Sequence, residues 1–269
     1  MRLKYKERRG YATMKYPIIL AHGIAIKETK IIHAFGKIES KLKSAGYDVY
    51  TANTDAFGSI ESNAEQLKNF IIEVLKKTNS EKVNIIAHSK GGLDSKYMIA
   101  HLDMADKVAS LTTICTPHHG SAIANHIWSL PRAIKKYLSF IINTFYKIVG
   151  DKNPDSLKVC EQLKKSDEDA IEASFADRVY CQSYSATITH INDCVLMGIP
   201  MSIYNITDGE VNDGMVSVES AKFEVYRGGC IDESVSHTQI VDLLAKRKNR
   251  EKIHAFYIEL CEDLENMGF

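Results

Sequence analysis

One short segment of the sequence surrounds a serine with the residues that a nucleophilic serine needs. Residues 83–87 are apolar enough for a buried strand, and His88-Ser89-Lys90-Gly91 follows at once. A serine on a tight turn between a strand and a helix exposes its hydroxyl for attack on a carbonyl carbon. The strand and helix pass close together there, so the residues two positions before and after must be small. They are Ala87 and Gly91. We predict Ser89 as a nucleophile, the alternative being an ordinary turn serine that caps a helix.

A nucleophilic serine also needs a histidine that takes its proton and a carboxylate that holds the histidine. On strand–turn–helix scaffolds of this kind, the acid and then the histidine follow the serine along the chain. His237 lies in a late polar loop, whereas His254 falls within a helical pattern and is expected at the surface. We therefore predict His237 as the base.

The acid is less sharply defined by the residues alone. Asp208, Asp213 and Asp232 all lie in plausible loops. The Asn-Asp-Gly sequence at 212–214 is also a common turn. The apolar residues at 215, 216 and 218 predict a strand that would fix the loop of Asp213.

Ester hydrolysis passes through an oxyanion, which two N–H donors must stabilise. On such scaffolds one donor is the backbone N–H of the residue after the nucleophile, here Lys90. The other comes from the loop after an early strand, which places it at Ile24. His22 begins the same loop and is expected to orient it rather than to act as the base.

The elements that would position these residues alternate along the chain. Strands are predicted at 17–21, 48–52, 83–87, 107–114, near 179 and at 201–206. Helices are predicted at 31–42, 64–75, 91–100 and 253–264. Such alternation is typical of parallel βαβ units with a covered central sheet. We expect one α/β domain over residues 1–269.

Residues 120–176 interrupt the alternation. Apolar residues recur at spacings of three and four from Ile123 to Ile148, which predicts helices that Pro131 separates by sitting in the first turn of the second. A basic amphipathic helix with aromatic residues suits an anionic interface. We expect a mobile lid here; the alternative is a buried helix pair with a solvated basic face. The residues expected to contact substrate from the lid are Ile123, Ile127, Trp128, Leu138 and Phe145.

Taken together, these segments resemble the bacterial true lipases of the pseudomonad type. The segments that carry the resemblance are 17–23, 87–92, 112–121, 155–157 with Leu163 and Phe175, 212–216 and His237. The similarity extends from about residue 17 to 240 and is weakest in the lid; Ala87 departs from the family's usual glycine. The resemblance implies the α/β-hydrolase fold, a mostly parallel central sheet flanked by helices with a helical lid insertion over 120–176. It also implies hydrolysis of acylglycerol esters through an acyl-enzyme, with Asp213 as the acid and Asp208 as the second choice.

The calcium site of these lipases does not carry over. Gln239 and Leu243 occupy two of the positions where its ligands are expected, and Asp193 matches one upstream carboxylate. One carboxylate and one amide make a weak site for a hard cation. We expect no metal and no other cofactor.

Bulk composition bounds the remaining possibilities. Lysine plus arginine (34) balances aspartate plus glutamate (34), so we expect no nucleic-acid partner. The six cysteines form no CxxC pair, although a disulfide among Cys181, Cys194 and Cys230 stays open. Residues 1–16 lack the apolar core of a signal peptide, so we expect an intracellular protein or one whose leader has been removed. Nothing in the pattern predicts an oligomeric state.

Two other classes of function fit the same residues. One is a short-chain carboxylesterase, phospholipase or acyltransferase on the same scaffold. The other is a non-catalytic binding module of the same fold, which loss of a triad residue would favour.

Overall fold

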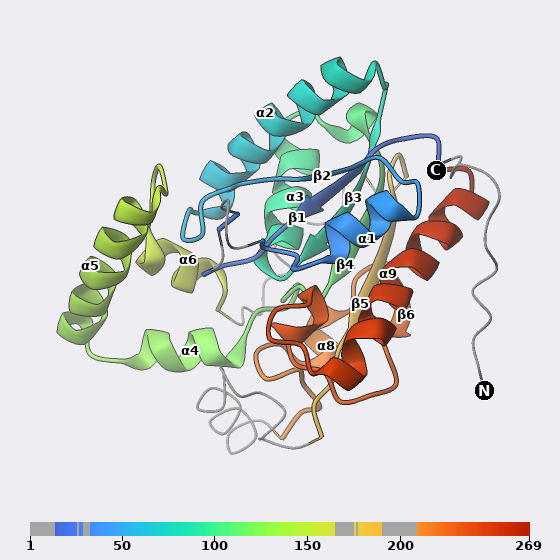
Figure 1. The fold of residues 1–269 in the computed structure, drawn as a ribbon. Coiled ribbons are helices and arrows are strands. Elements are labelled where there is room, and N and C mark those ends of the chain that lie inside the picture. The colour runs from blue at the N-terminus through green and yellow to red at the C-terminus, as the bar shows by residue number, and fades with distance from the viewer. Residues whose placement is uncertain (1–13, 26, 29–32, 165–174, 176, 190–208) are drawn as a thin grey trace.

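The computed structural model describes residues 14–25, 27–28, 33–164, 175, 177–189 and 209–269 (Figure 1). Its described strands form one six-stranded sheet in the order β2-β1-β3-β4-β5-β6, and every neighbouring pair is parallel. The strands are β1 (Ile18–Ala21), β2 (Val49–Thr51), β3 (Val83–His88), β4 (Val108–Ile114), β5 (Tyr180–Ser185) and β6 (Val225–Gly229). The covered parallel sheet that the alternation predicted is confirmed.

Helices pack on both faces of this sheet. On one face, α1 (Ile38–Ser44) and α9 (Arg247–Asn266) share a core with Ile18 and Leu20 of β1. On the other, α2 (Ile60–Thr78) and α3 (Lys90–His101) share a core with Ile19 of the same strand. Successive side chains of a strand point to opposite faces. A sheet covered on both sides therefore buries every residue of its inner strands, which explains the unbroken apolar runs.

Three helices project from one side of the sheet, at the left of Figure 1. They are α4 (Ala122–Ser129), α5 (Arg132–Val149) and α6 (Ser156–Gln162). The apolar stripe does break at Pro131, because Leu130 and Pro131 have ψ angles of 150° and 141°. The expected place of Pro131 in the first turn is wrong by one position, since it precedes α5 as its N-cap. Among the residues that the structure describes, no helix is long and apolar enough to cross a bilayer.

Several local predictions are wrong. Residues 218–221 form the short helix α8 (Val218–Ala221) rather than a strand, because the Ser217 hydroxyl caps the helix by accepting from Ser220 N–H. After His237 the chain forms one 3-10 turn, η3 (Gln239–Val241). β6 was not predicted, since its residues are half exposed and lack an apolar run. Residues 34–37, expected in the first helix, form turns before α1 begins.

Some predictions fall outside the described residues. They are the strand at 201–206, Asp193, Cys194 and Asp208. The five described cysteines, which include Cys181 and Cys230, are free.

Candidate active site

Ser89 occupies the turn between β3 and α3. Its backbone angles are φ 56° and ψ −133°, a conformation that a side-chain-bearing residue rarely adopts. Such strain costs on the order of 1–3 kcal/mol and persists only where the surroundings impose it. Here Ser89 N–H donates to Ile114 O at 2.9 Å, and the Thr116 hydroxyl donates to Ser89 O at 2.8 Å. The sharp turn predicted for the nucleophile is therefore present and braced from the end of β4.

Close approach of two backbones at this turn explains its glycines. A Cβ on Gly91 would lie 2.5 Å from Ala21 O and 2.6 Å from His22 O. A Cβ on Gly23 would lie 2.6 Å from Ser89 Cβ. All three distances are shorter than real Cβ contacts, so neither position accepts a side chain unless its neighbours move. The loop after β1 thus lies directly against Ser89, where an oxyanion donor is needed.

Asp213 and His237 meet across 24 residues of sequence. His237 Nδ1 lies 2.7 Å from Asp213 Oδ2, and the exposed fractions of the two side chains are 5% and 1%. The other carboxylate oxygen accepts from the backbone N–H groups of Met215 and Val216 at 2.9 and 2.8 Å. An imidazole held at Nδ1 by a fixed carboxylate keeps Nε2 available to accept a proton. This pair has the geometry of a base and its orienting acid.

His88 lies between this pair and the nucleophile, since its ring contacts His237 and it directly precedes Ser89 in the chain. Its ring packs against that of His237, with centroids 4.5 Å apart and planes inclined by 48°. Burial, reinforced by the adjacent His237 ring, lowers the pKa of His88 well below its ordinary value. A neutral His88 adds no charge beside the base. Sequence reasoning did not single out this residue, although it stands directly before Ser89.

The loop that follows His237 is fixed by Asp242. This carboxylate accepts from Arg250 Nε at 2.8 Å, from Lys37 N–H at 3.1 Å and from His254 Nε2 at 2.9 Å. Burial alone would raise the pKa of Asp242, but His254, the Lys37 N–H and Arg250 together lower it. The expectation that His254 lies at the surface is wrong. The residue is buried, and its ring contacts the Asp242 carboxylate.

At the position compared with calcium ligands, the Gln239 amide oxygen accepts from Ser236 N–H at 3.2 Å. That oxygen is therefore already used within the loop. The absence of a metal site stays a prediction.

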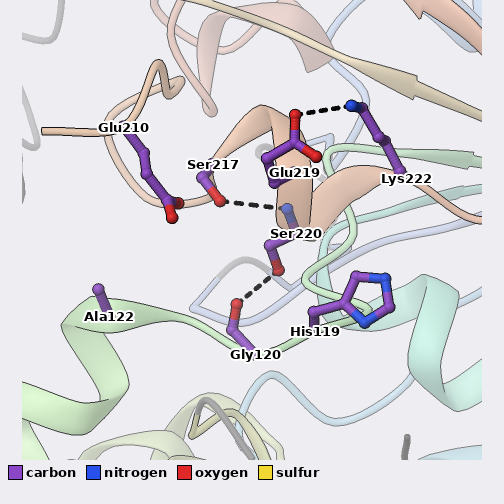
Figure 2. Close-up of a pocket in the computed structure, with 8 residues that line it drawn as sticks. All are labelled: His119, Gly120, Ala122, Glu210, Ser217, Glu219, Ser220 and Lys222. Atoms are coloured by element: carbon purple, nitrogen blue, oxygen red, sulfur yellow. Dashed lines mark hydrogen bonds and ion pairs between the residues drawn. The ribbon is translucent and has the colours of Figure 1, made fainter. Parts of the chain in front are cut away.

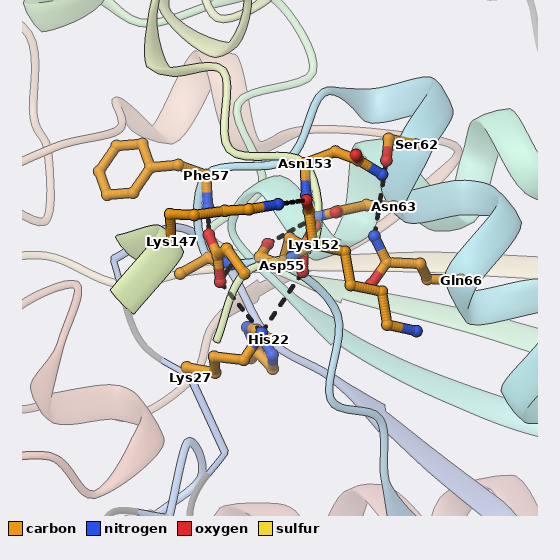
Figure 3. A network of polar contacts seen from close by, with 12 residues as sticks. His22, Lys27, Asp55, Phe57, Ser62, Asn63, Gln66, Lys147, Lys152 and Asn153 are labelled. Carbon is orange, nitrogen blue, oxygen red and sulfur yellow. Dashed lines mark hydrogen bonds and ion pairs between the residues drawn. The ribbon is translucent and has the colours of Figure 1, made fainter. Parts of the chain in front are cut away.

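Two buried aspartates, Asp55 and Asp151, belong to one network of polar contacts, and Figure 3 shows Asp55 within it. Asp55 accepts from the backbone N–H groups of residues 152 and 153, each at 2.8 Å. Asp151 accepts reciprocally from those of residues 56 and 57 at 3.0 and 2.9 Å. Lys27 Nζ lies 3.0 Å from Asp151 and 3.4 Å from Asp55. The end of α5 is thereby tied to the loop between β2 and α2.

The candidate oxyanion loop is bound to the same structure. Ala25, at φ 65°, donates its N–H to Ala56 O at 3.2 Å. The Tyr146 hydroxyl of α5 donates to Ala25 O at 2.8 Å. His22 Nδ1 lies 2.9 Å from Gly23 O, and burial lowers the pKa of this histidine. These contacts agree with the orienting role expected of His22.

Lys90, the other candidate oxyanion residue, has a buried side chain. Its Nζ lies 2.6 Å from Asp94 Oδ1, and the exposed fractions are 1% and 2%. Burial raises the pKa of Asp94 to about 6, although Lys90 and Asn63 oppose the shift. This pair holds the first turn of α3 beneath the nucleophile.

Comparisons with known proteins identify the family. Residues 18–192 match the family model described as "Putative serine esterase (DUF676)". The chain belongs to this serine esterase family.

Curated relatives of this chain are named triacylglycerol lipases. The chain is 36% identical over 169 residues to one from Pseudarthrobacter phenanthrenivorans, a match that covers 61% of this chain and 50% of that protein. Equal identity relates it to one from Burkholderia plantarii, covering 61% and 45%. The chain thus spans about half the length of these two relatives. Triacylglycerol lipase 2 of Saccharomyces cerevisiae is 27% identical over 256 residues, covering 86% and 73%.

Solved structures resemble this chain over most of its length. A lipase from Staphylococcus hyicus superposes with a TM-score of 0.66 at 16% identity, covering 94% of this chain and 97% of that one. A lipase from Bacillus licheniformis gives 0.61 at 19%, covering 87% and 89%. A metagenomic carboxyl esterase gives 0.72 at 15%, covering 94% and 77%. At these identities the likeness concerns the fold, and it confirms the predicted α/β-hydrolase fold.

An apolar cavity of about 250 Å³ lies beside the candidate oxyanion loop. Ile24 and Met215 line it. Three of the five residues expected in the lid line it as well, namely Ile123, Ile127 and Leu138. The other two expected lid residues lie elsewhere. Trp128 packs between the ammonium groups of Lys135 and Lys164, 4.1 and 4.7 Å from its ring centroid. Phe145 is 57% exposed and does not line the cavity.

A second hollow, of about 340 Å³, lies between α8 and the segment after β4 (Figure 2). Its serines already have partners. Ser220 Oγ donates to Gly120 O at 2.6 Å, and Ser217 Oγ accepts from Ser220 N–H at 3.1 Å. The predicted triad lies outside this hollow. Its contacts brace the loop of Asp213 against residues 118–120.

Proposed function

We propose that this protein hydrolyses lipid esters through an acyl-enzyme intermediate, with Ser89 as nucleophile, His237 as base and Asp213 as acid. The observation that supports this most is the 2.7 Å contact between His237 Nδ1 and Asp213 Oδ2. The His237 ring also packs on His88, which directly precedes the strained Ser89. An ordinary turn serine would not need a histidine–carboxylate pair beside it. Membership of a serine esterase family supports the same reaction class.

The reaction runs in two halves. Ser89 Oγ attacks the ester carbonyl carbon while His237 Nε2 takes its proton, and the Asp213 carboxylate stabilises the resulting imidazolium. The oxyanion accepts from the backbone N–H groups of Lys90 and Ile24. The C–O bond to the alcohol breaks, the alcohol leaves with the proton from His237, and Ser89 carries the acyl group. Water, deprotonated by His237, then releases the acid and restores the serine.

The apolar cavity supports an acyl chain as the part of the substrate that is recognised. It adjoins Ile24, so a chain bound there leads towards the reacting carbonyl. Each methylene removed from water contributes about 0.8 kcal/mol, which favours esters of longer acids. The names of the relatives, triacylglycerol lipases, also support a lipid ester as the substrate.

The lid remains part of this proposal, within the expected insertion 120–176. Ser139 is the only buried residue of α5, whose residues are all described, while Tyr137, Phe140 and Ile148 are exposed by 66%, 70% and 81%. Helices that expose so much apolar surface usually meet another apolar phase. Arg132, Lys136 and Lys147 add positive charge on the same helix, and no acidic residue occurs between 107 and 150. We assign α5 to contact with a lipid–water interface.

A short-chain carboxylesterase is the second candidate, and the cavity size favours it. About 250 Å³ is smaller than the pockets of roughly 300–1,000 Å³ that hold larger ligands. A long acyl chain would therefore need α5 to move away from α6. In a carboxylesterase, α5 would stay in place.

Rates on p-nitrophenyl esters of increasing acyl length separate these candidates. A lipase gives kcat/KM values that rise to long chains, and a carboxylesterase gives a maximum at short ones. Parallel assays on phospholipid, and on ester with added alcohol, identify phospholipase and acyltransferase activity. Absence of turnover and of covalent labelling by a fluorophosphonate would leave the non-catalytic module. Ser89→Ala is the control for background hydrolysis.

A further inference from the structure

Cys115 stands directly after the last residue of β4 in a conformation that cysteine seldom adopts. Its φ is 52°, in the left-handed region. Its side chain is buried, with the residue 1% exposed, and its N–H donates to Tyr184 O at 2.9 Å. Left-handed residues other than glycine cluster at functional sites, where the surroundings hold them. The mechanism above gives this thiol no role.

The Cys115 thiol lies close to the proposed acid, Asp213, and the proposed base, His237. Cys115 Sγ, a carboxylate oxygen of Asp213 and a ring nitrogen of His237 all lie within 4.8 Å of one another. An ionised carboxylate accepts about four hydrogen bonds. Three of the Asp213 positions are taken by His237 and by the N–H groups of Met215 and Val216. One acceptor position therefore remains, and a thiol is a weak donor suited to it.

The protonation state of this thiol agrees with a donor. Burial, followed by contacts with the Cys230 thiol and the Asp213 carboxylate, raises the pKa of Cys115 well above its ordinary value. At neutral pH the side chain is thus a neutral S–H group. A thiolate would instead repel Asp213.

We propose that Cys115 is a positioning residue, whose S–H donates to the Asp213 carboxylate and holds it in the orientation that grips His237. The effect on turnover rests on the proposed function, whereas the effect on the imidazole does not. A donor on Asp213 disperses its negative charge, so the carboxylate stabilises the imidazolium of His237 less. Removing the donor must therefore raise the pKa of His237, and a stronger donor must lower it.

The groups that face His237 are few among the described residues. Asp213 and Cys115 lie on one side and His88 packs on its ring. Cys230 interacts with Cys115, the Tyr257 hydroxyl interacts with both thiols, and His22 interacts with His88. The matched control is Cys230→Ala, which removes the buried thiol that contacts Cys115 and leaves the Cys115 S–H group in place.

The experiment compares Cys115→Ala, Cys115→Ser and Cys230→Ala with the native chain. The pKa of His237 is measured by NMR on histidine-labelled protein, its signal assigned with His237→Ala, and kcat and KM are measured on a soluble short-chain ester. In Cys115→Ala we expect the His237 pKa to rise by about 0.3 to 0.5. We expect kcat to fall roughly three- to tenfold with KM nearly constant, because the acid is misplaced. Cys115→Ser should bring kcat back to within about twofold and lower the pKa below the native value, since a hydroxyl is the stronger donor.

Equal His237 pKa values in the native chain and both Cys115 variants would overturn the proposal. So would an equal loss of kcat in the serine and alanine variants, since packing alone then explains both, or a shift in Cys230→Ala as large as in Cys115→Ala. If Cys115→Ala fails to fold, the downward pKa shift in Cys115→Ser decides. If the native chain has no esterase activity, the proposed function fails, and the NMR titration still decides the role of Cys115.

Discussion

His254 Nε2 lies 2.9 Å from Asp242 Oδ2, and both side chains are buried. Asp242 comes five residues after the candidate base His237. With Arg250 Nε on the other carboxylate oxygen at 2.8 Å, this contact joins the loop of His237 to α9. The Lys37 N–H attaches the same carboxylate to the start of α1. Side-chain and backbone donors of the chain thus anchor the histidine loop.

Chelation should therefore leave the protein almost unchanged. We expect less than about twofold change in activity, and no change in melting temperature, after dialysis against EDTA, because the loop uses protein donors and Gln239 is already bonded. Asp242→Asn, in contrast, removes the charge that Arg250 and His254 contact and should cost about 1–2 kcal/mol of unfolding free energy, less than for a fully buried pair because the Arg250 side chain is 40% exposed. A large loss of activity with EDTA that calcium restores would show that a cation holds this loop.

Acid should destabilise the fold partly through Asp55. Burial alone would raise the pKa of this carboxyl, but the N–H groups of Lys152 and Asn153, Gln66 and Lys27 together lower it below 3.8. A lowered pKa contributes stability that is present above 3.8 and is lost as the pH falls through the folded-state value. Asp55→Asn should therefore be less stable at pH 7 and lose less stability between pH 5 and 3.

Denaturant unfolding across that range measures the effect of Asp55. Asp94 acts with the opposite sign: its pKa, raised from 3.8 to about 6, contributes stability that is present below 3.8 and is lost as the pH rises through 6. Asp94 is unchanged in both proteins, so its contribution cancels in the comparison. Asp106→Asn is the matched control, because its side chain is 85% exposed. Parallel pH profiles for native chain and Asp55→Asn would contradict the assignment.

Ser89→Ala should abolish both ester hydrolysis and labelling by a fluorophosphonate. Only a base-activated serine attacks such reagents, so mass spectrometry of the labelled peptide identifies the nucleophile. The melting temperature should hardly change, since the strained backbone is held by contacts of the main chain. Ser129→Ala, on the exposed end of α4, serves as control. Covalent labelling of any other serine would show that the nucleophile is that serine and not Ser89.

The acid and the base are tested by their relative losses. His237→Ala and Asp213→Asn should each reduce kcat by several orders of magnitude, roughly 10⁴-fold or more, because triad residues act as a unit. Asp208→Asn should change kcat by less than about threefold, since nothing then disturbs the His237–Asp213 contact. Steady-state rates on a soluble ester measure all three. A severe loss in Asp208→Asn with a mild one in Asp213→Asn would reassign the acid.

Interfacial rate enhancement tests the lid. Opening α5 in water exposes apolar surface, and an interface offsets that cost at about 25 cal/mol per Å². The rate should therefore rise disproportionately once a long-chain substrate passes its solubility limit. Phe145→Ser should lower this rise and spare hydrolysis of a soluble short-chain ester, since Phe145 is exposed. Trp128→Ser should do the same only if its packing between two lysines is not needed for folding.

Met267→Ser is the control for the lid experiment, because Met267 is also an exposed apolar residue but lies after α9. A rate that stays smooth through the solubility limit in the native chain would mean that α5 is no lid.

The sequence alone determined the nucleophile turn and the architecture around it. Both depend on neighbours in sequence: an apolar run, small residues at 87 and 91, and strands alternating with helices. Burial and close backbone approach leave such patterns because they restrict which side chains fit. The assignment of Asp213 over Asp208 needed more than local pattern, since several loop aspartates look alike.

Only the tertiary structure decided which polar groups meet. Asp213 reaches His237 and Cys115 reaches Asp213 because neighbouring strands end at one edge of the sheet and the chain returns there from far along the sequence. Residues 218–221 likewise form a helix because a serine cap and contacts with residues 118–120 outweigh the apolar pattern at 215, 216 and 218. Such pairings depend on strand order and register, which a local pattern of side chains does not encode.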